Sequence, residues 1–258
     1  MYAIVTAGGI PQPGEPLYDF TLGKSKALLD VAGKPMIQWV LDALSAASTV
    51  DGVIIMGLTA EDGVSCTKPL TYVPNQGEML SNILTGLKEV VKVAPEASHA
   101  LIVSSDIPAL TPESVDWVAN TALQTDHDAY YNVIERETME KRFPGSNRTY
   151  TRLKGAQVCG GDLNVARTLM GTGKDELWQR IIDSRKNAFK QASLLGFDLL
   201  FLLLIRQVTI EQAEKKVSQR IGLKAKVLRC PYAEVGMDID KPHQLEILRA
   251  DLEKRVKA

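Results

Sequence analysis

Short apolar runs and helical patterns alternate along the first half of the chain. The apolar runs contain many β-branched side chains and are typical of buried strands; they cover residues 2–6, 53–57, 70–73, 100–104 and 128–134. The segments between them repeat apolar residues at helical spacing, over about 36–47, 80–91 and 112–122. Strands separated by helices of this length predict an α/β fold with three layers and a mainly parallel mixed sheet.

Several residues mark where these helices begin and end. Pro35 is expected at a first helical position, and Thr111, followed by Pro112, is expected to cap the next-but-one helix. Thr209 and Gln212 form a capping box for a later helix, which Gly222 should end.

The alternation breaks between about residues 135 and 222. Residues 135–154 are polar and mainly basic, and a helical region is expected over about 174–205. We therefore expect a single domain over 1–258, with a helical insertion or subdomain at about 135–222 laid on the sheet. The sheet should resume at 225–229 and end with a strand carrying Asp238 and Asp240, before a closing helix.

The apolar run within 194–205 is well short of the roughly 20 residues that span a bilayer. It is interpreted as subdomain core or as the face of a homodimer. The alternative is a membrane-associated interfacial helix that handles a lipid-linked acceptor.

Charge and cysteine content exclude several classes of protein. The chain has 30 basic and 31 acidic residues, so no overall charge favours nucleic acid or an acidic membrane surface. Cys66, Cys159 and Cys230 have neither zinc-ligand spacing nor a disulfide pattern, and no signal peptide is recognised. These features favour a cytoplasmic protein that does not bind nucleic acid.

Glycines and aspartates lie where the expected strands end. Ala7-Gly8-Gly9 closes the first strand, Asp106 follows the strand at 100–104, and Asp238-Ile239-Asp240 precedes the closing helix. Ligands bind at strand ends in open α/β sheets, and carboxylates beside exposed backbone N–H groups suit Mg²⁺ and a polyphosphate. The alternative is structural: glycines that only turn the chain, Asp106 as a turn cap, and Asp238 as a solvated strand end.

Four motifs in a fixed order resemble a known family. They are Ala7-Gly8-Gly9, Lys26-Ala27-Leu28-Leu29 with Gly33-Lys34-Pro35-Met36-Ile37, Asp106-Ile107-Pro108, and Asp240-Lys241-Pro242-His243-Gln244-Leu245. The chain resembles the Rossmann-like nucleotidyltransferases, and its motifs are most similar to those of the molybdenum-cofactor guanylyl- and cytidylyltransferases. The resemblance covers about 1–135 and 225–252.

This resemblance implies transfer of a nucleoside monophosphate from an NTP to a phosphorylated small-molecule acceptor, with release of pyrophosphate. It implies Mg²⁺ held by Asp106 and Asp240, with Asp238 orienting Asp240 or binding the metal through water. It implies catalytic roles for Lys26, Asp106 and Asp240. The implied nucleotide-binding residues are Ala7, Gly8, Gly9, Lys24, Lys26, Asn75, Gly77, Ser81, Asn82 and Asp106; Ser81 and Asn82 have helix capping as an alternative role.

One segment departs from the family pattern. The family's first loop carries an arginine that reaches the triphosphate, whereas residues 10–23 contain none. Either Lys24 takes its place or the contact is lost, so a catalytically degenerate nucleotide-binding protein is one alternative. A metal-dependent glycosyltransferase of related fold is another, but Asp106 is followed by Ile107 and Pro108 instead of a central Asp-x-Asp.

Overall fold

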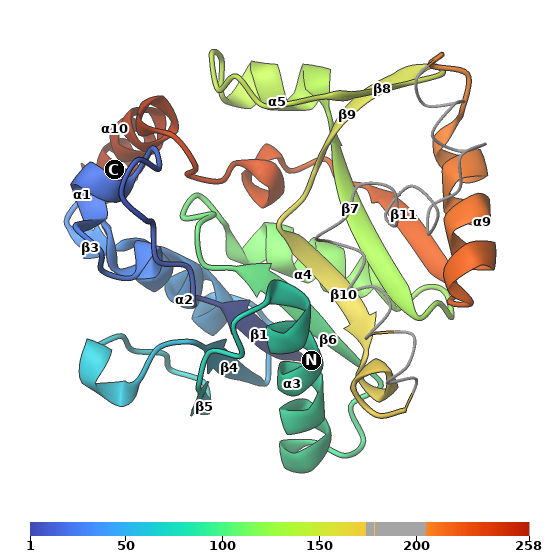
Figure 1. Ribbon diagram of the computed structural model, residues 1–258, viewed down its shortest axis with the longest axis horizontal. Coiled ribbons are helices and arrows are strands. Elements are labelled where there is room, and N and C mark those ends of the chain that lie inside the picture. Colours follow the sequence, from blue (N-terminus) through green and yellow to red (C-terminus); the bar gives the residue numbers. More distant parts are fainter. Residues whose placement is uncertain (174–177, 179–204, 258) are drawn as a thin grey trace.

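The computed structural model describes residues 1–173, 178 and 205–257. These residues form a mixed sheet of nine strands with helices on both sides (Figure 1). The strands are β1 (Tyr2–Thr6), β4 (Gly52–Met56), β5 (Leu70–Val73), β6 (His99–Ser104), β7 (Ala129–Glu135), β8 (Thr151–Leu153), β9 (Ala156–Gly160), β10 (Leu163–Arg167) and β11 (Ala225–Arg229). A separate small hairpin is formed by β2 (Asp30–Val31) and β3 (Lys34–Pro35).

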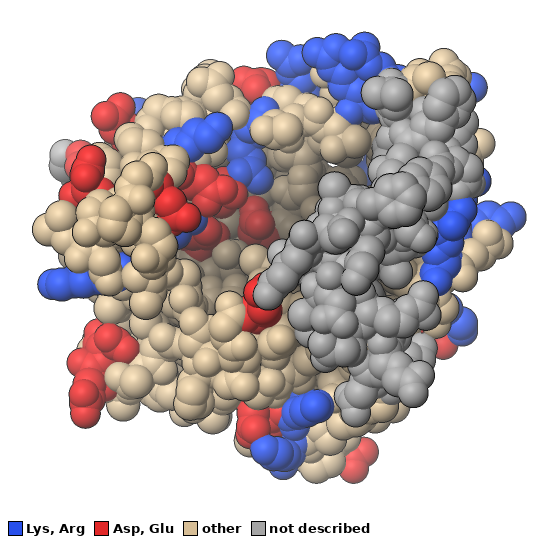
Figure 2. All heavy atoms as spheres, viewed as in Figure 1, with Lys and Arg blue, Asp and Glu red and all other residues tan. Residues whose placement is uncertain are grey.

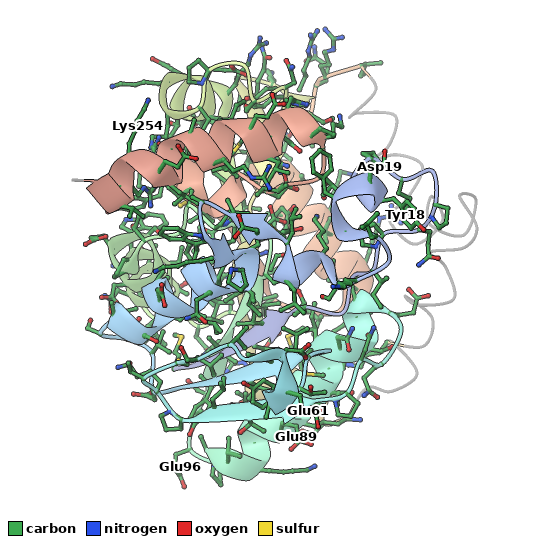
Figure 3. All side chains as sticks on the ribbon, turned by 90° about the vertical axis from the view of Figure 1, so that its left-hand side faces the viewer. Tyr18, Asp19, Glu61, Glu89, Glu96 and Lys254 are labelled. Carbon is green, nitrogen blue, oxygen red and sulfur yellow. The ribbon has the colours of Figure 1, made fainter. Side chains whose placement is uncertain are left out.

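Seven α-helices lie within the described residues. They are α1 (Tyr18–Thr21), α2 (Met36–Ala46), α3 (Met79–Val93), α4 (Pro112–Ala122), α5 (Arg136–Arg142), α9 (Ile210–Ile221) and α10 (Pro242–Lys257). Four short 3₁₀ helices accompany them: η1 (Lys26–Leu28), η2 (Ala60–Asp62), η3 (Thr168–Gly171) and η4 (Ala233–Gly236). The short α1 lies beside the long α10, and Tyr18 and Asp19 mark it in the rotated view (Figures 1 and 3).

The sheet order is β5-β4-β1-β6-β10-β7-β9-β8, and β11 pairs with β7. Strands β5, β4, β1 and β6 are parallel to one another, and β11 is parallel to β7. Strand β10 runs antiparallel between β6 and β7. The predicted α/β fold with a mainly parallel mixed sheet is therefore confirmed.

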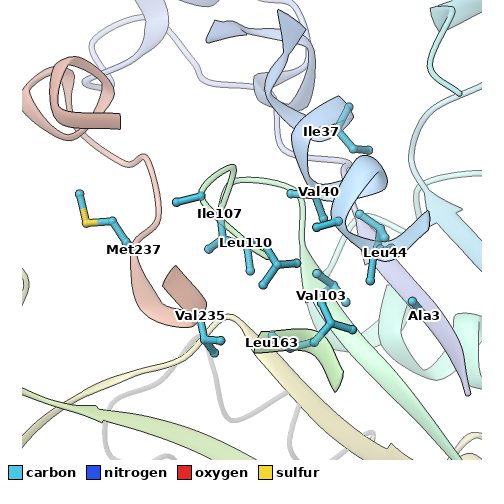
Figure 4. Close-up of a cluster of buried hydrophobic side chains, with 14 of the residues drawn as sticks. Ala3, Ile37, Val40, Leu44, Val103, Ile107, Leu110, Leu163, Val235 and Met237 are labelled. Carbon is cyan, nitrogen blue, oxygen red and sulfur yellow. The ribbon is translucent and has the colours of Figure 1, made fainter. Parts of the chain in front are cut away.

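Alternate residues of β1 face the two cores. Ala3 and Val5 join the larger core, to which α2, α4 and α10 contribute, whereas Ile4 joins a second core with α3. Successive strand residues point to opposite faces, so a fully apolar strand must be covered on both sides. Figure 4 shows part of the larger core, where Val40 and Leu44 of α2 lie over Ala3 and Val103 of the strands.

Most local signals in the sequence act as expected. The Thr111 side chain accepts a hydrogen bond from the backbone N–H of Ser114 and caps α4, and the Thr209 side chain caps α9. Gly222 ends α9 with a left-handed φ of 66°. Pro35 lies one position earlier than predicted, at the N-cap of α2, because it also pairs with Asp30 in the β2–β3 hairpin.

Two predicted elements are wrong. Residues 135–173 are not a helical layer on the sheet: after α5 they supply β8, β9 and β10, which pair within it. Their apolar positions alternate over short runs, which suits strands. The segment carrying Asp238 and Asp240 is not a strand; it follows η4 as an irregular segment linked to the strand-end loop by a hydrogen bond from Ile239 N–H to the Asp106 carbonyl.

The helical region expected over about 174–205, including the apolar run at 194–205, lies almost wholly outside the described residues. Among the residues that the structure does describe, no helix combines the length and apolar character needed to cross a membrane.

Candidate active site

The predicted site residues converge at one edge of the sheet. Thr6 at the end of β1 is in register with Ser104 at the end of β6, and because the strands are parallel both carboxyl ends open onto the same edge. The connection from β1 leads to β4 on one side, and β6 lies on the other, which makes this edge a topological switch point. This arrangement brings the glycine turn after β1 beside Asp106 after β6.

The glycine turn packs against two neighbouring loops. A Cβ atom at Gly8 would lie 2.6 Å from the Asn75 side chain, and one at Gly57, whose φ is 101°, would lie 2.6 Å from the Gly8 Cα. Only glycine therefore allows the ends of β1, β4 and β5 to approach this closely. The Asn75 amide then donates a hydrogen bond of 3.1 Å to the Gly8 carbonyl.

Lys26 reaches this edge from η1. Its backbone N–H donates to the Gly9 carbonyl at 2.9 Å, and the Ser25 hydroxyl donates to the Ala7 carbonyl at 3.1 Å. These two bonds attach the lysine loop to the glycine turn. The Lys26 ammonium then contacts Asp106 at 2.6 Å and Asp240 at 2.7 Å.

Asp240 is held in place through its own backbone. The buried Gln244 side chain of α10 accepts hydrogen bonds from the N–H groups of Asp240 and Lys241, both at 2.9 Å. Asp106 is fixed by a bond of 2.5 Å from the Ser104 hydroxyl. Both carboxylates are thus oriented before any ligand binds.

Lys26, Asp106 and Asp240 form a charged cluster, and their charges shift the pKa values of Lys26 and Asp240. Burial opposes the charge on Lys26, but Asp106 and Asp240 outweigh it and raise the pKa of the ammonium. Burial also works against the charged form of Asp240, yet Lys26 holds the pKa of this carboxyl below its usual value. Both groups of the Lys26–Asp240 pair are therefore charged at neutral pH.

A cavity of about 340 Å³ opens above these residues. Figure 2 shows acidic side chains gathered around a hollow on this face of the molecule. The residues that line the cavity are Thr6, Gly8, Gly9, Lys26, Ala27, Asn75, Gly77, Met79, Asn82, Ser104, Ser105, Asp106 and Asp240.

Two amide side chains, Asn75 and Asn82, also line the cavity. Asn82 donates to the Asn75 side chain at 2.9 Å and accepts a hydrogen bond of 2.8 Å from the backbone N–H of Gln76. Asn82 therefore orders the 75–77 turn instead of capping its own helix. The amide pair and the Gly77 backbone offer polar groups of the kind that read a base or a ribose.

A second charged group lies next to the first. Arg148 forms an ion pair with Asp238 and approaches Asp162 at 3.7 Å. Burial, followed by the charges of Asp106 and Asp238, raises the pKa of Asp162 to about 8. Burial also raises the pKa of Asp238, although Arg148 acts in the opposite direction.

The structure separates the predicted site residues into two groups. Gly8, Gly9, Lys26, Asn75, Gly77, Asn82, Asp106 and Asp240 line one cavity. Ala7 is buried below it, Lys24 is exposed, and Ser81 in the first turn of α3 is not among the lining residues. Asp238 pairs with Arg148 and Asp240 with Lys26, and a side-chain hydrogen bond also joins Asp238 to Asp240.

Sequence reasoning missed Ser104 and Gln244 as parts of the site; it placed the Gly160-Gly161-Asp162 turn near the acceptor, by resemblance to the family, but gave Asp162 no role of its own. Strand β10 runs antiparallel to β6, so the start of β10 lies next to the end of β6. Asp162 directly precedes β10 and therefore lies at this edge, where its carbonyl accepts a hydrogen bond of 2.8 Å from the Ser104 N–H. The Gly160-Gly161-Asp162 turn was the available signal, since it has the same form as a strand-end turn.

The raised pKa of Asp162 gives a prediction about stability. Its folded-state value of about 8 lies above the ordinary value of 3.8, so the folded protein binds this proton more tightly than the unfolded chain. The contribution of Asp162 to the free energy of unfolding should therefore fall as the pH rises from about 4 to 8. In EDTA, Asp162→Asn should raise the Tm by roughly 2–4 °C near pH 8.5 and by little near pH 5.

Calorimetry or thermal melts followed by circular dichroism would measure this difference. Asp19→Asn is the matched control, because Asp19 is exposed on α1 and does not line the cavity. An equal gain at both pH values would contradict the assignment.

The donor set at this edge fits a divalent cation bound together with phosphates. The Lys26 ammonium already places one cationic centre in contact with Asp106 and Asp240. Within the described ranges, no group of three or more His, Cys, Asp or Glu side chains is arranged to hold a metal ion. Mg²⁺ typically takes one or two carboxylates and completes its shell with water and substrate phosphates, for which the adjoining cavity leaves room.

Comparison with known proteins agrees with this geometry. Residues 15–190, more than half of the chain, match the MobA-like NTP transferase domain. The chain belongs to this nucleotidyltransferase family. The matched range contains Lys26 and Asp106, whereas the glycine turn precedes it and Asp240 follows it.

Two curated relatives match different shares of the chain. A 3-deoxy-manno-octulosonate cytidylyltransferase of Geotalea uraniireducens is 27% identical over 92% of this chain and 96% of its own. A probable molybdenum cofactor guanylyltransferase of Thermococcus gammatolerans is 26% identical over 50% of this chain and 73% of its own. The names of these two relatives differ in both the nucleotide that is transferred and the acceptor.

Solved structures share the fold. A hypothetical transferase from Thermus thermophilus is 32% identical and superposes with a TM-score of 0.82 over 95% of this chain and 98% of its own. A CMP:2-keto-3-deoxy-manno-octonic acid synthetase solved with CTP has a TM-score of 0.59 over 98% of this chain and 99% of its own. At 14% identity, the second likeness supports the fold alone.

Proposed function

We propose that this protein is a Mg²⁺-dependent nucleotidyltransferase that transfers a nucleoside monophosphate from an NTP to a phosphorylated small-molecule acceptor. One observation carries the proposal: Lys26, Asp106 and Asp240 meet in a single cavity with the Gly8-Gly9 turn. A backbone turn, a lysine and paired carboxylates are the groups that bind a triphosphate together with its metal.

The reaction needs no protein nucleophile. An oxygen of the acceptor attacks the α-phosphorus of the NTP, and the bond from this phosphorus to the bridging oxygen of the β-phosphate breaks as pyrophosphate leaves. The residues act by positioning and by neutralising charge. Asp106 and Asp240 would hold the metal, which when bound supplies positive charge to the phosphate oxygens.

Other residues of the site would bind and orient the nucleotide. The Gly8 and Gly9 backbone lines the cavity and would face the phosphates, and Asn75 with Asn82 orders the turn that would face the base and ribose. Lys26 would bind phosphate oxygens.

The acceptor would bind beside the neighbouring charged group, which consists of Arg148, Asp238 and Asp162. Arg148 comes from the basic segment 135–154 and is the residue of that segment that pairs with Asp238 and approaches Asp162 beside the cavity. A guanidinium is well suited to a phosphate, which supports a phosphorylated acceptor.

A pyrophosphate-release assay tests the proposal. The protein would be incubated with Mg²⁺ and each of CTP, GTP, UTP, ATP and dTTP, together with sugar 1-phosphates, polyol phosphates, lipid-precursor phosphates or molybdopterin. 3-Deoxy-manno-octulosonate serves as the unphosphorylated acceptor. We expect pyrophosphate release that requires one NTP, one phosphorylated acceptor and Mg²⁺, with a nucleotide-linked product identified by mass spectrometry.

The rival functions give different results in the same assay. Nucleotide binding without turnover of any pair would favour a degenerate nucleotide-binding protein. Release of a nucleoside diphosphate from a nucleotide sugar would favour a glycosyltransferase. Turnover with the unphosphorylated sugar acid alone would overturn the proposed acceptor class.

A further inference from the structure

The Lys26 ammonium occupies the position between two carboxylates that a divalent cation would need. It contacts Asp106 at 2.6 Å and Asp240 at 2.7 Å, and the three side chains come from distant parts of the chain. Because both oxygens touch one nitrogen, a small approach would bring them within the roughly 2.1 Å contacts of Mg²⁺. Lysine and metal cannot both occupy this position.

The cluster is also short of positive charge. Among the residues that the structure describes, Asp106, Asp240, Asp162 and Asp238 gather around Lys26 and Arg148. The excess is one negative charge while Asp162 keeps its proton and two when all four carboxyls are ionised. A triphosphate adds several more. Lys26 is already neutralised by its two carboxylates, so it can serve the phosphates only if another cation takes over Asp106 and Asp240.

The backbone of Lys26 does not have to move for this exchange. Its N–H is bonded to Gly9, and the preceding Ser25 is bonded to Ala7, so the start of the side chain is fixed at the glycine turn. The ammonium ends a flexible stem and lines the same cavity as Gly8 and Gly9. A change of rotamer would carry it from the carboxylates towards the phosphates.

We propose that Lys26 and the divalent cation compete for the Asp106–Asp240 pair, so that Lys26 holds the pair until metal and nucleotide enter together and release it to the triphosphate. This inference rests on the proposed function, because it assigns the metal to the same two carboxylates. The exchange makes binding of the divalent cation weak when no nucleotide is present, and it makes the binding of cation and NTP depend on each other. A purely structural ion pair would also weaken metal binding, but it would not couple the binding of metal to the binding of nucleotide.

Direct Mn²⁺ binding, followed by the electron paramagnetic resonance signal of free Mn²⁺, tests the exchange. We expect weak binding to the wild type without nucleotide. Lys26→Met, which keeps the length of the side chain and removes its charge, should bind Mn²⁺ about 10-fold or more tightly. An NTP should then increase Mn²⁺ affinity less in Lys26→Met than in the wild type.

Two further variants complete the design. Lys26→Gln removes the charge but retains hydrogen bonding to the carboxylates. It should also bind Mn²⁺ more tightly than the wild type, and it serves as the test if Lys26→Met fails to fold. Lys34→Met is the matched control, because Lys34 pairs with Asp42 at 2.7 Å outside the cavity, and its Mn²⁺ affinity should equal that of the wild type.

The outcomes separate this inference from the proposed function. If Mn²⁺–NTP binding depends on Asp106 and Asp240 but neither Lys26 variant binds free Mn²⁺ more tightly, the exchange is wrong and the metal site stands. If Mn²⁺–NTP binding is unchanged in Asp106→Asn and Asp240→Asn, both the exchange and the proposed metal site are wrong.

Discussion

Replacing Asp106 by asparagine should reduce kcat/KM for pyrophosphate release by about 1000-fold or more while leaving the fold intact. The new amide oxygen could still accept the hydrogen bond that Ser104 donates, but the charge that faces Lys26 and the proposed metal would be lost. Charge stabilisation of this kind contributes several kcal/mol to catalysis, and each 1.4 kcal/mol is about tenfold in rate. Steady-state kinetics with saturating Mg²⁺ would measure the loss.

The chain offers a matched control for this experiment. Asp42→Asn removes a carboxylate that also contacts one lysine, Lys34, but lies outside the cavity. It should leave kcat/KM within about twofold of the wild type. If Asp106→Asn retained a tenth of wild-type activity, the metal assignment would have to be abandoned.

Removing the charge of Lys26 should have the next largest effect. A charge-assisted contact to phosphate contributes roughly 1.5–3 kcal/mol, and more where charge develops in the transition state. Lys26→Met should therefore lower kcat/KM by about 10- to 1000-fold, even though we expect it to bind free Mn²⁺ more tightly. Opposite changes in metal affinity and turnover would be difficult to explain by unfolding.

The variant Lys24→Met tests whether Lys24 takes the place of the arginine that reaches the triphosphate in the family's first loop. Lys24 is exposed and does not line the cavity, so its loss should lower kcat/KM by less than tenfold. An effect as large as that of Lys26→Met would show that Lys24 supplies the contact that the family's arginine makes. Wild-type kinetics in Lys26→Met would place the phosphate site elsewhere.

Local features of the fold and the first candidates for the site followed from the sequence alone. Strands β1, β5 and β6 could be predicted because runs such as Tyr2–Thr6 are apolar on both faces, as buried parallel strands require. Thr111, Thr209 and Gly222 marked helix ends because capping is decided by neighbouring residues. The order of the motifs predicted that Gly8, Lys26, Asp106 and Asp240 belong to one site, and in the structure these four residues line the same cavity.

The partners of these residues were decided by the tertiary structure. Lys26 meets Asp106 and Asp240 across 80 and 214 residues of sequence, and no local pattern records such contacts. Asp162 joins the cluster because β10 runs antiparallel to β6, and strand direction depends on pairing and not on periodicity. Arg148 meets Asp238 across 90 residues for the same reason: long-range packing decides which side chains come together. The sequence identified the charged groups, and the fold decided their partners.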